Sequence, residues 1–163
     1  MSKLRLIFVK EQQASYISHL DVMRTFQRVF PRAGLSLRHS NGFHPHPVLS
    51  IVLPLPVGQS SDCEILDFES VEDSTGEGVA EALNTGMPAG LRVLDCYSVT
   101  RPVREMRYLR AALELEYDGG VPEGACERIR EFFTQEEILV EKRTKHKGMT
   151  ELNIAPLIRS LTI

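Results

Sequence analysis

Apolar positions along the first 34 residues predict one strand followed by one helix. Residues 3–9 (KLRLIFV) alternate and are rich in large apolar side chains, which is typical of a half-buried strand. Between residues 18 and 34, apolar side chains recur at helical spacing, with Ser18 at the expected N-cap and Gly34 after the last turn. The predicted apolar stripe consists of Leu20, Met23, Phe26 and Phe30.

The rest of the chain continues with short apolar runs separated by Gly, Pro and polar residues. Their alternation or helical spacing predicts strands or helices. In the first hundred residues, strands are predicted over 35–40, 48–54, 63–70 and 91–99, and a helix over 76–87. After a break at 100–105, the pattern predicts a strand over 109–118, a helix over 122–133, and strands over 136–144 and 148–158, the last two joined by a basic turn over 142–148.

This order of elements predicts an α+β protein with two units. Residues 1–100 follow the ferredoxin-like βαββαβ plan with an added strand. Residues 101–163 repeat the start of that plan and lack its last helix and strand, so we expect a second, truncated ferredoxin-like unit packed on the first.

Charge is distributed unevenly along the 163 residues. Residues 1–58 carry seven Lys or Arg against two Asp or Glu (+5), and residues 59–98 carry one against nine (−8). The basic part suits an anionic partner such as a nucleic acid, and a solvated charged face is the alternative. With no apolar run of about 20 residues and no signal-peptide pattern, we expect a cytoplasmic protein without a membrane partner.

The three cysteines, Cys63, Cys96 and Cys126, are far apart and form no CxxC pattern. They indicate free thiols, and they exclude the closely spaced thiolate patterns that hold iron–sulfur clusters. The chain also lacks a P-loop, an RNP1 pattern, a GxGxxG turn and a recognisable nucleophile signature, so a nucleotide-hydrolysing enzyme is not expected.

The start of the first predicted helix, SHLD, contains a candidate site. His19 and Asp21 lie at a helix N-terminus, where backbone N–H groups favour anions, and a histidine there can transfer protons or contact phosphate. Alternatively, Ser18 and Asp21 cap the helix and His19 faces solvent. Farther along, Arg24, Arg28 and Arg32 share one helix face that either contacts phosphates or is simply solvated.

The segment LRHSNGFHPHPVLS, residues 37–50, contains three histidines, His39, His44 and His46. In extended geometry His44 and His46 point to one side, so a metal site with His39 or His19 is one alternative. A turn that aims a histidine and backbone donors at a ligand is another, and a purely structural turn is the third. Phe43 offers a stacking face for a base. Glu64 and Asp67 join such a site only if the fold brings them near.

Residues 8–68 resemble the radical SAM-linked protein family, a bacterial domain of unknown function, and the likeness is looser up to residue 163. The shared pattern combines the SHLD helix start, S-x-GF-x-PHP, PLP-x-G and S-x-x-E-x-x-D. His39 and His44 fall outside it, which leaves His46 as the histidine of a turn aimed toward the SHLD helix start. The matching positions are Ser18, His19, Asp21, Arg24, Ser40, Gly42, Phe43, Pro45, His46, Pro47, Gly58, Glu64 and Asp67.

Members of that family occur fused to, or encoded beside, a cobalamin-binding radical SAM protein, often near genes for an RNase E/G-type ribonuclease. The resemblance implies a non-catalytic accessory module that binds RNA or presents a substrate to the radical SAM partner. The partner would carry the iron–sulfur cluster, S-adenosylmethionine and cobalamin, and this chain would carry no cofactor. The expected binding residues are His19, Asp21, Arg24, Arg28, Ser40, Gly42, Phe43, His46, Glu64 and Asp67.

Two alternatives remain open. The first is a metal-independent RNA-processing enzyme that uses His19 and His46 as its catalytic groups, an interpretation based only on analogy with other duplicated ferredoxin-like folds. The second is a metal-binding scaffold that uses His39, His44 and His46.

Overall fold

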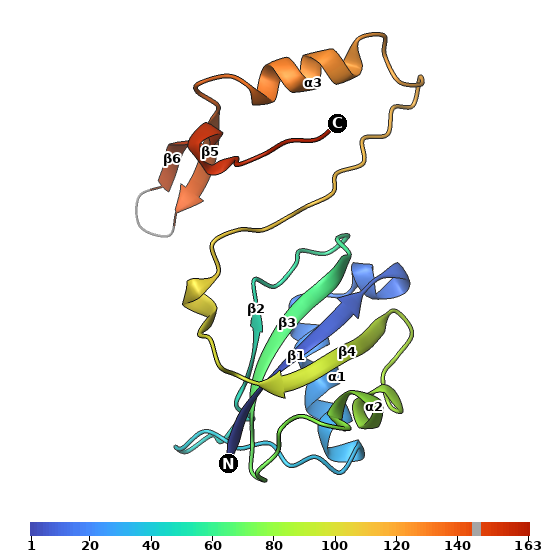
Figure 1. The fold of residues 1–163 in the computed structure, drawn as a ribbon, viewed down its shortest axis with the longest axis vertical. Coiled ribbons are helices and arrows are strands. Elements are labelled where there is room, and N and C mark those ends of the chain that lie inside the picture. Colours follow the sequence, from blue (N-terminus) through green and yellow to red (C-terminus); the bar gives the residue numbers. More distant parts are fainter. Residues whose placement is uncertain (145–147) are drawn as a thin grey trace. The chain divides into compact units, whose positions relative to one another are not determined.

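The computed structural model describes residues 1–144 and 148–163, so part of the predicted basic turn over 142–148 lies outside the described residues. The chain divides into two compact units, Met1–Tyr108 (the first unit) and Leu109–Ile163 (the second unit), which are drawn in Figure 1. The division falls after residue 108 rather than after residue 100. In the described part of the chain, no helix has both the length and the apolar character needed to cross a membrane.

The first unit is a four-stranded antiparallel sheet with two helices on one face (Figure 1). Its order is β2-β3-β1-β4, so β1 lies between β3 and β4 and pairs with both. This is the βαββαβ plan that the sequence predicts, and the α+β class is confirmed. In chain order its main elements are β1 (Ser2–Lys10), α1 (His19–Arg32), β2 (Leu49–Val52), β3 (Ser61–Ser70), α2 (Val79–Asn84) and β4 (Leu91–Ser98).

The strand predicted over residues 35–40 is not formed, so the first unit has four strands and not five. Leu37 makes an isolated bridge to Ser70, and His39 makes another to Pro47. Arg38 still bonds to Glu69, but from Phe68 back toward Ile65 the edge of β3 pairs with β2, so residues beyond Arg38 have no further partner on that strand. Pro47 has no N–H to donate, so a ladder cannot continue between the two arms of this loop.

The core of the first unit lies between the sheet and the helices. Even-numbered residues of β1 and β3 face α1, as in the edge-to-face contact of Phe8 with Phe26 at 4.9 Å and the contact of Phe30 with Phe68 at 4.7 Å. The predicted apolar stripe of α1 is partly wrong, because Leu20 is 54% exposed. The position one turn before Phe26 on the same face is Val22. The buried stripe therefore consists of Val22, Phe26, Val29 and Phe30.

The second unit contains one helix and a two-stranded antiparallel sheet. These elements are α3 (Ala125–Phe133), β5 (Leu139–Thr144) and β6 (Gly148–Asn153), and all three fall inside predicted segments. The strand predicted over 109–118 is not formed, and its leucines are exposed. Alternation assigns side chains to two faces, but a strand also needs a neighbour for its hydrogen bonds, and β5 and β6 pair only with each other.

Three short 3-10 helices complete the described elements. They are η1 (Gln12–Tyr16), η2 (Val103–Glu105) and η3 (Ala155–Leu157). Of these, η1 matters for the site because it connects the end of β1 to the start of α1.

Candidate functional site

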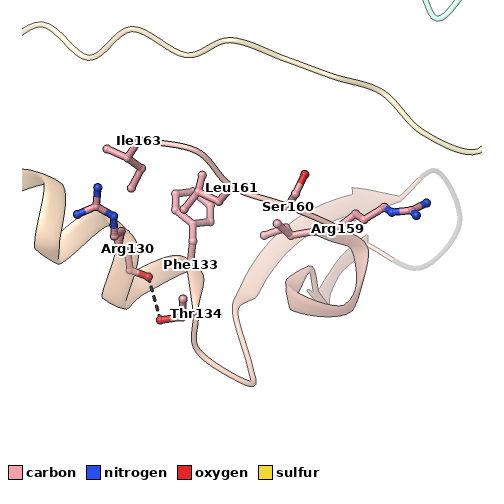
Figure 2. A pocket seen from close by; sticks show the side chains of 8 residues that line it. Arg130, Phe133, Thr134, Arg159, Ser160, Leu161 and Ile163 are labelled. Atoms are coloured by element: carbon pink, nitrogen blue, oxygen red, sulfur yellow. Dashed lines mark hydrogen bonds between the residues drawn. The ribbon is translucent and has the colours of Figure 1, made fainter.

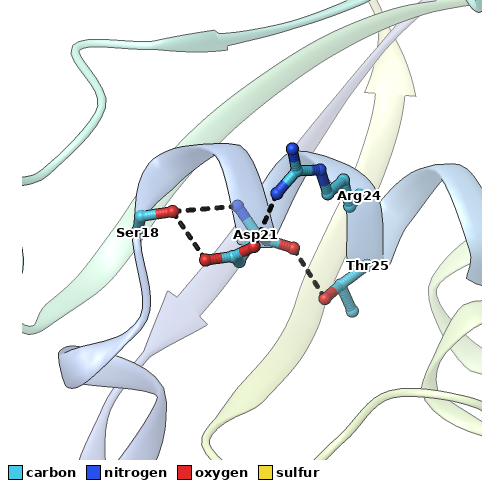
Figure 3. A network of polar contacts seen from close by, with 4 residues as sticks. All are labelled: Ser18, Asp21, Arg24 and Thr25. Carbon is cyan, nitrogen blue, oxygen red and sulfur yellow. Dashed lines mark hydrogen bonds and ion pairs between the residues drawn. The ribbon is translucent and has the colours of Figure 1, made fainter.

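The start of α1 is held by a local network of polar contacts (Figure 3). Ser18 Oγ accepts a hydrogen bond from the Asp21 backbone N–H at 3.2 Å and donates one to Asp21 Oδ2 at 2.7 Å. Arg24 Nη1 donates to Asp21 Oδ1 at 3.0 Å. The hydrogen bond from Ser18, followed by that from Arg24, lowers the pKa of the Asp21 carboxyl. Ser18, Asp21 and Arg24 therefore serve the helix start, as the capping interpretation predicts.

His19 lines a small cavity at the opposite side of this helix start, which we call the corner cavity. Its volume is about 10 Å³. The lining residues come from β1, α1, β2, β3 and the loop after β2, and they are Phe8, Lys10, His19, Val22, Ile51, Pro54, Leu55 and Glu64. Of the predicted site residues, the structure brings His19 and Glu64 together here.

Lys10 and Glu64 are charged residues at core-facing positions. Lys10 follows Leu4, Leu6 and Phe8 on one face of β1 and is 2% exposed, and Glu64 is 8% exposed. Lys10 Nζ donates to the carbonyl oxygens of Ser15 and Gln59, both at 3.2 Å. Charged side chains on the buried face of a strand are unusual unless they have a function.

Burial shifts the pKa values of both groups in the direction that favours the neutral form of each. The pKa of the Lys10 ammonium is lowered by burial, against a smaller raising effect of Glu64. The pKa of the Glu64 carboxyl is raised by burial, against hydrogen bonding by Ser61 and the charge of Lys10. Sequence reasoning missed Lys10, although its position was readable, since it continues the alternation of the apolar positions of KLRLIFVK.

Asp67 lies on the other face of the sheet, because it is three residues from Glu64 and side chains alternate along a strand. Arg5 Nε donates to Asp67 Oδ1 at 2.6 Å and Arg5 Nη2 donates to Asp67 Oδ2 at 2.9 Å. This two-pronged ion pair, chiefly through its hydrogen bonds, raises the pKa of Arg5. Asp67 therefore neutralises a buried arginine and does not join Glu64.

The loop over residues 39–47, which we call the histidine loop, is closed by Ser40 and His46. Ser40 N–H donates to the His46 carbonyl at 2.8 Å, Ser40 Oγ and His46 Nδ1 are 2.8 Å apart, and His46 N–H donates to Ser40 Oγ at 3.2 Å. Gly42 has a φ of 131°, a conformation that glycine adopts readily. His46 thus helps to shape the turn, and the Phe43 side chain at its tip is fully exposed.

His19 and His46 lie at opposite ends of the sheet. The histidine loop follows the Leu37 bridge to Ser70, which pairs with Ser2 at the start of β1. The corner cavity contains Lys10, the last residue of β1. A strand of nine residues separates these ends by roughly 25 Å. The prediction that the turn aims His46 toward the SHLD helix start is wrong, and the two histidines do not form a common catalytic pair.

The metal hypothesis gains no support from the positions of the histidines. His39 Nδ1 lies 3.1 Å from the Leu37 carbonyl oxygen, a contact inside its own turn. Residues 1–144 and 148–163 contain no group of three or more His, Cys, Asp or Glu side chains placed to hold a metal ion.

Two arginines of α1, Arg28 and Arg32, are exposed. Among the residues that the structure describes, no acidic side chain forms an ion pair with either of them. Arg24 differs, because Asp21 neutralises it, and Arg38 pairs with Glu69. The predicted arginine face is therefore reduced to its last two members, near the Ser2 end of the sheet.

A larger cavity, of about 300 Å³, lies within the second unit (Figure 2). The end of α3 and the C-terminal segment line it, with Thr134 Oγ1 donating to the Arg130 carbonyl at 2.9 Å. Its lining residues are Arg130, Phe133, Thr134, Ile158, Arg159, Ser160, Leu161 and Ile163. It contains none of the predicted site residues.

Comparison with known proteins places the chain in one family. Neither the curated proteins nor the solved structures include a match to it. A family model described as "uncharacterized protein conserved in bacteria" (DUF2344) matches residues 3–163. Because that match spans both units, the chain belongs to this bacterial family of uncharacterized proteins.

Proposed function

We propose that this chain is an accessory binding module of a radical SAM enzyme system and that it holds RNA for its partner through the Ser2 end of the sheet. The observation that carries this proposal is the side chain of Phe43. It is fully exposed at the tip of a loop whose two arms are tied together. An exposed aromatic ring on a fixed loop is suited to stacking on an unpaired base.

The histidine loop is fixed at several levels. Besides the Ser40–His46 contacts, Val48 N–H donates to the Arg38 carbonyl and Arg38 N–H donates to the Glu69 carbonyl, both at 2.8 Å. The ring of Phe43 is therefore carried by a loop anchored to β3. Less conformational entropy is lost on binding when the contact residue is held in advance.

Positive charge lies at the same end of the sheet. The last turns of α1 carry Arg28 and Arg32, and the chain then leads through Gly34 into the Leu37 bridge beside Ser70. Exposed arginines without acidic partners favour phosphate contacts, which supply most of the affinity for a nucleic acid and make it depend on salt. This end of the sheet therefore offers an aromatic ring for a base and two arginines for phosphates.

The resemblance and the site support separate roles for the partner and for this chain. The radical chemistry, with its iron–sulfur cluster, S-adenosylmethionine and cobalamin, belongs to the partner in this proposal. The side chains of this chain bind and orient the RNA. The Ser40–His46 pair supports binding rather than catalysis, because both groups are used in closing the turn.

The test is fluorescence anisotropy with a labelled single-stranded RNA pool at several salt concentrations. We expect binding that weakens with salt, and a loss of about tenfold in affinity for Phe43→Ala because one stacked base is lost. Phe132→Ala, at an exposed phenylalanine of the second unit, is the matched control and should bind normally. An RNA affinity independent of salt, or unchanged in Phe43→Ala, contradicts the proposal.

The accessory role has a separate test. The tagged chain is expected to co-purify with a cobalamin-binding radical SAM protein of the same bacterium when both are expressed together. If the two proteins never co-purify while RNA binding persists, the accessory part of the proposal fails and the RNA part stands.

A further inference from the structure

The corner cavity holds two opposite charges that do not touch. Lys10 and Glu64 both line it, and each is more than nine-tenths buried. Within the described residues, neither takes part in an ion pair at 4.0 Å or less. Buried charges are normally paired directly, so a separated pair facing one cavity leaves room for a group that contacts both.

The hydrogen-bonding capacity of the cavity is defined by these two side chains. An ammonium group has three N–H donors, and Lys10 uses two of them on the carbonyl oxygens of Ser15 and Gln59. The carboxylate of Glu64 has four lone-pair positions, and Ser61 occupies only part of this capacity. A complementary ligand therefore has an acceptor for Lys10 beside two donors for Glu64.

Residues 53–60 cover the cavity. Pro54 and Leu55 line it, while Gly58 N–H donates to the Ser15 carbonyl at 2.8 Å and Gln59 accepts from Lys10. In this closed form the cavity has about the volume of one water molecule. The rest of this segment is largely exposed, so few contacts oppose its displacement.

Backbone strain is concentrated at the same corner. Among the described residues, the non-glycine residues with positive φ are Gln12, at 50°, and Leu53, at 52°. Gln12 begins η1, which follows Lys10, and Leu53 begins the covering segment. Such strained positions cluster at ligand sites and moving segments.

We propose that the corner cavity is a guanine site, in which the Watson–Crick edge of an unpaired guanine enters between Lys10 and Glu64 when residues 53–60 lift. The keto oxygen accepts from Lys10, and the N1–H and N2–H groups donate to the Glu64 carboxylate. His19, exposed at the rim, provides a ring face for stacking on the base. This inference rests on the proposed RNA binding and names the base that the module selects.

Guanine fits this arrangement better than the other bases. It presents two N–H donors beside one carbonyl oxygen, and adenine has no carbonyl oxygen. Uracil has one N–H between two carbonyl oxygens, and one of these would face the carboxylate. Cytosine has one amine donor beside two acceptors. Only guanine satisfies Lys10 and both oxygens of Glu64 together.

The first experiment titrates the full chain with GMP, IMP and AMP by calorimetry. The three share the same phosphate, so differences report the base. IMP lacks the N2 amine, and we expect GMP to bind about tenfold more tightly because one hydrogen bond to a charged group is lost. AMP should bind more weakly than IMP. Equal affinities for the three nucleotides, or no binding of GMP, overturn the proposal.

The second experiment uses variants of β3. Glu64→Gln should abolish the preference for GMP over IMP, since its amide N–H₂ meets the donors of the base. Asp62→Asn, an exposed acid two residues away, is the control and should keep the preference. If Glu64→Gln does not fold, the GMP and IMP comparison on the unchanged chain still decides. A Glu64→Gln chain that keeps the preference, or an unchanged chain that shows none while its Phe43-dependent RNA binding is intact, overturns this site alone.

Discussion

The two units were predicted to begin with the same succession of strand, helix, strand and strand, but they differ in what they bury. In the first unit, β1 lies between β3 and β4 (Figure 1), and its residues Leu4, Leu6 and Phe8 form a core with α1. In the second unit, α3 accompanies a sheet of only β5 and β6. Among its described residues, Ala125 and Ile138 are the buried apolar ones. The contrast teaches that an alternating segment builds a core only where it joins a larger sheet whose apolar face packs against helices.

The helices show the same contrast at their starts. Both α1 and α3 are amphipathic, with polar and apolar residues on separate faces. Helix α1 has Ser18 as an N-cap with a side-chain hydrogen bond, while the N-cap of α3 is Gly124, which has no side chain to offer. In the first unit, α1 is therefore stabilised by its side-chain N-cap as well as by packing against the sheet.

The largest expected difference between the units comes from a cavity-creating substitution in the core of the first unit. Phe26 is 0% exposed and packs on Phe8 and Phe30. Phe26→Ala should lower the free energy of unfolding by about 4 kcal/mol in urea denaturation, because it removes a buried ring and leaves a cavity. Phe132→Ala, at a half-exposed ring of the second unit, should cost less than about 1 kcal/mol. Similar losses for the two variants would contradict the difference between the units.

Breaking the buried ion pair should give the next largest effect. Asp67→Asn should cost about 3 kcal/mol, since it leaves the buried Arg5 guanidinium without its charged partner. Glu105→Gln, which breaks the exposed pair with Arg101, should cost less than about 1 kcal/mol in the same assay. If both variants unfold at the same urea concentration as the unchanged chain, the Arg5–Asp67 pair does not stabilise the sheet.

Substitutions at the two helix N-caps should change stability by smaller amounts and in opposite directions. Ser18→Ala should destabilise the first unit by about 1 kcal/mol, because the Asp21 N–H loses its acceptor. Gly124→Asn should stabilise α3 by a few tenths of that, roughly 0.3 kcal/mol, since asparagine caps helices and tolerates positive φ. Helicity measured by circular dichroism against temperature separates the two outcomes. A gain of stability in Ser18→Ala would rule out the capping role.

Thiol labelling sharpens the comparison without changing stability. Burial raises the pKa of Cys96 in the first unit to about 12, whereas Cys63 and Cys126 are exposed. Because the thiolate is the reactive form, two thiols should react with a disulfide reagent at pH 8 and the third only after denaturation. In Cys126→Ser, only one thiol should react before denaturation. Three fast thiols in the folded chain would show that the core around Cys96 is open.

The sequence patterns predicted local structure well and long-range neighbours poorly. The alternation of KLRLIFVK and the Ser18 cap depend on neighbouring residues, so β1 and the start of α1 followed from them. The pairing of Arg5 with Asp67 depends on the register of β1 against β3. The separation of His19 from His46 depends on which ends of the strands adjoin. Neither property is encoded in spacing along the chain.

The candidate site shows the same limit. His19 and Glu64 were expected site residues, and their meeting in the corner cavity could not be derived from a separation of forty-five positions. Lys10 could have been found from the alternation of side chains along β1 alone, since it occupies the next core-facing position after Phe8. A charged residue at such a position is a signal that resemblance to a family does not give.

If the proposed RNA binding holds, the length of β1 sets a minimum size for an RNA that reaches both proposed contacts. The Phe43 ring is at the Ser2 end and the corner cavity at the Lys10 end, so one molecule must span roughly 25 Å to reach both. A shorter oligonucleotide occupies one end at a time. Affinity plotted against oligonucleotide length should then rise in a step rather than gradually, because the second contact becomes intramolecular once the strand is long enough.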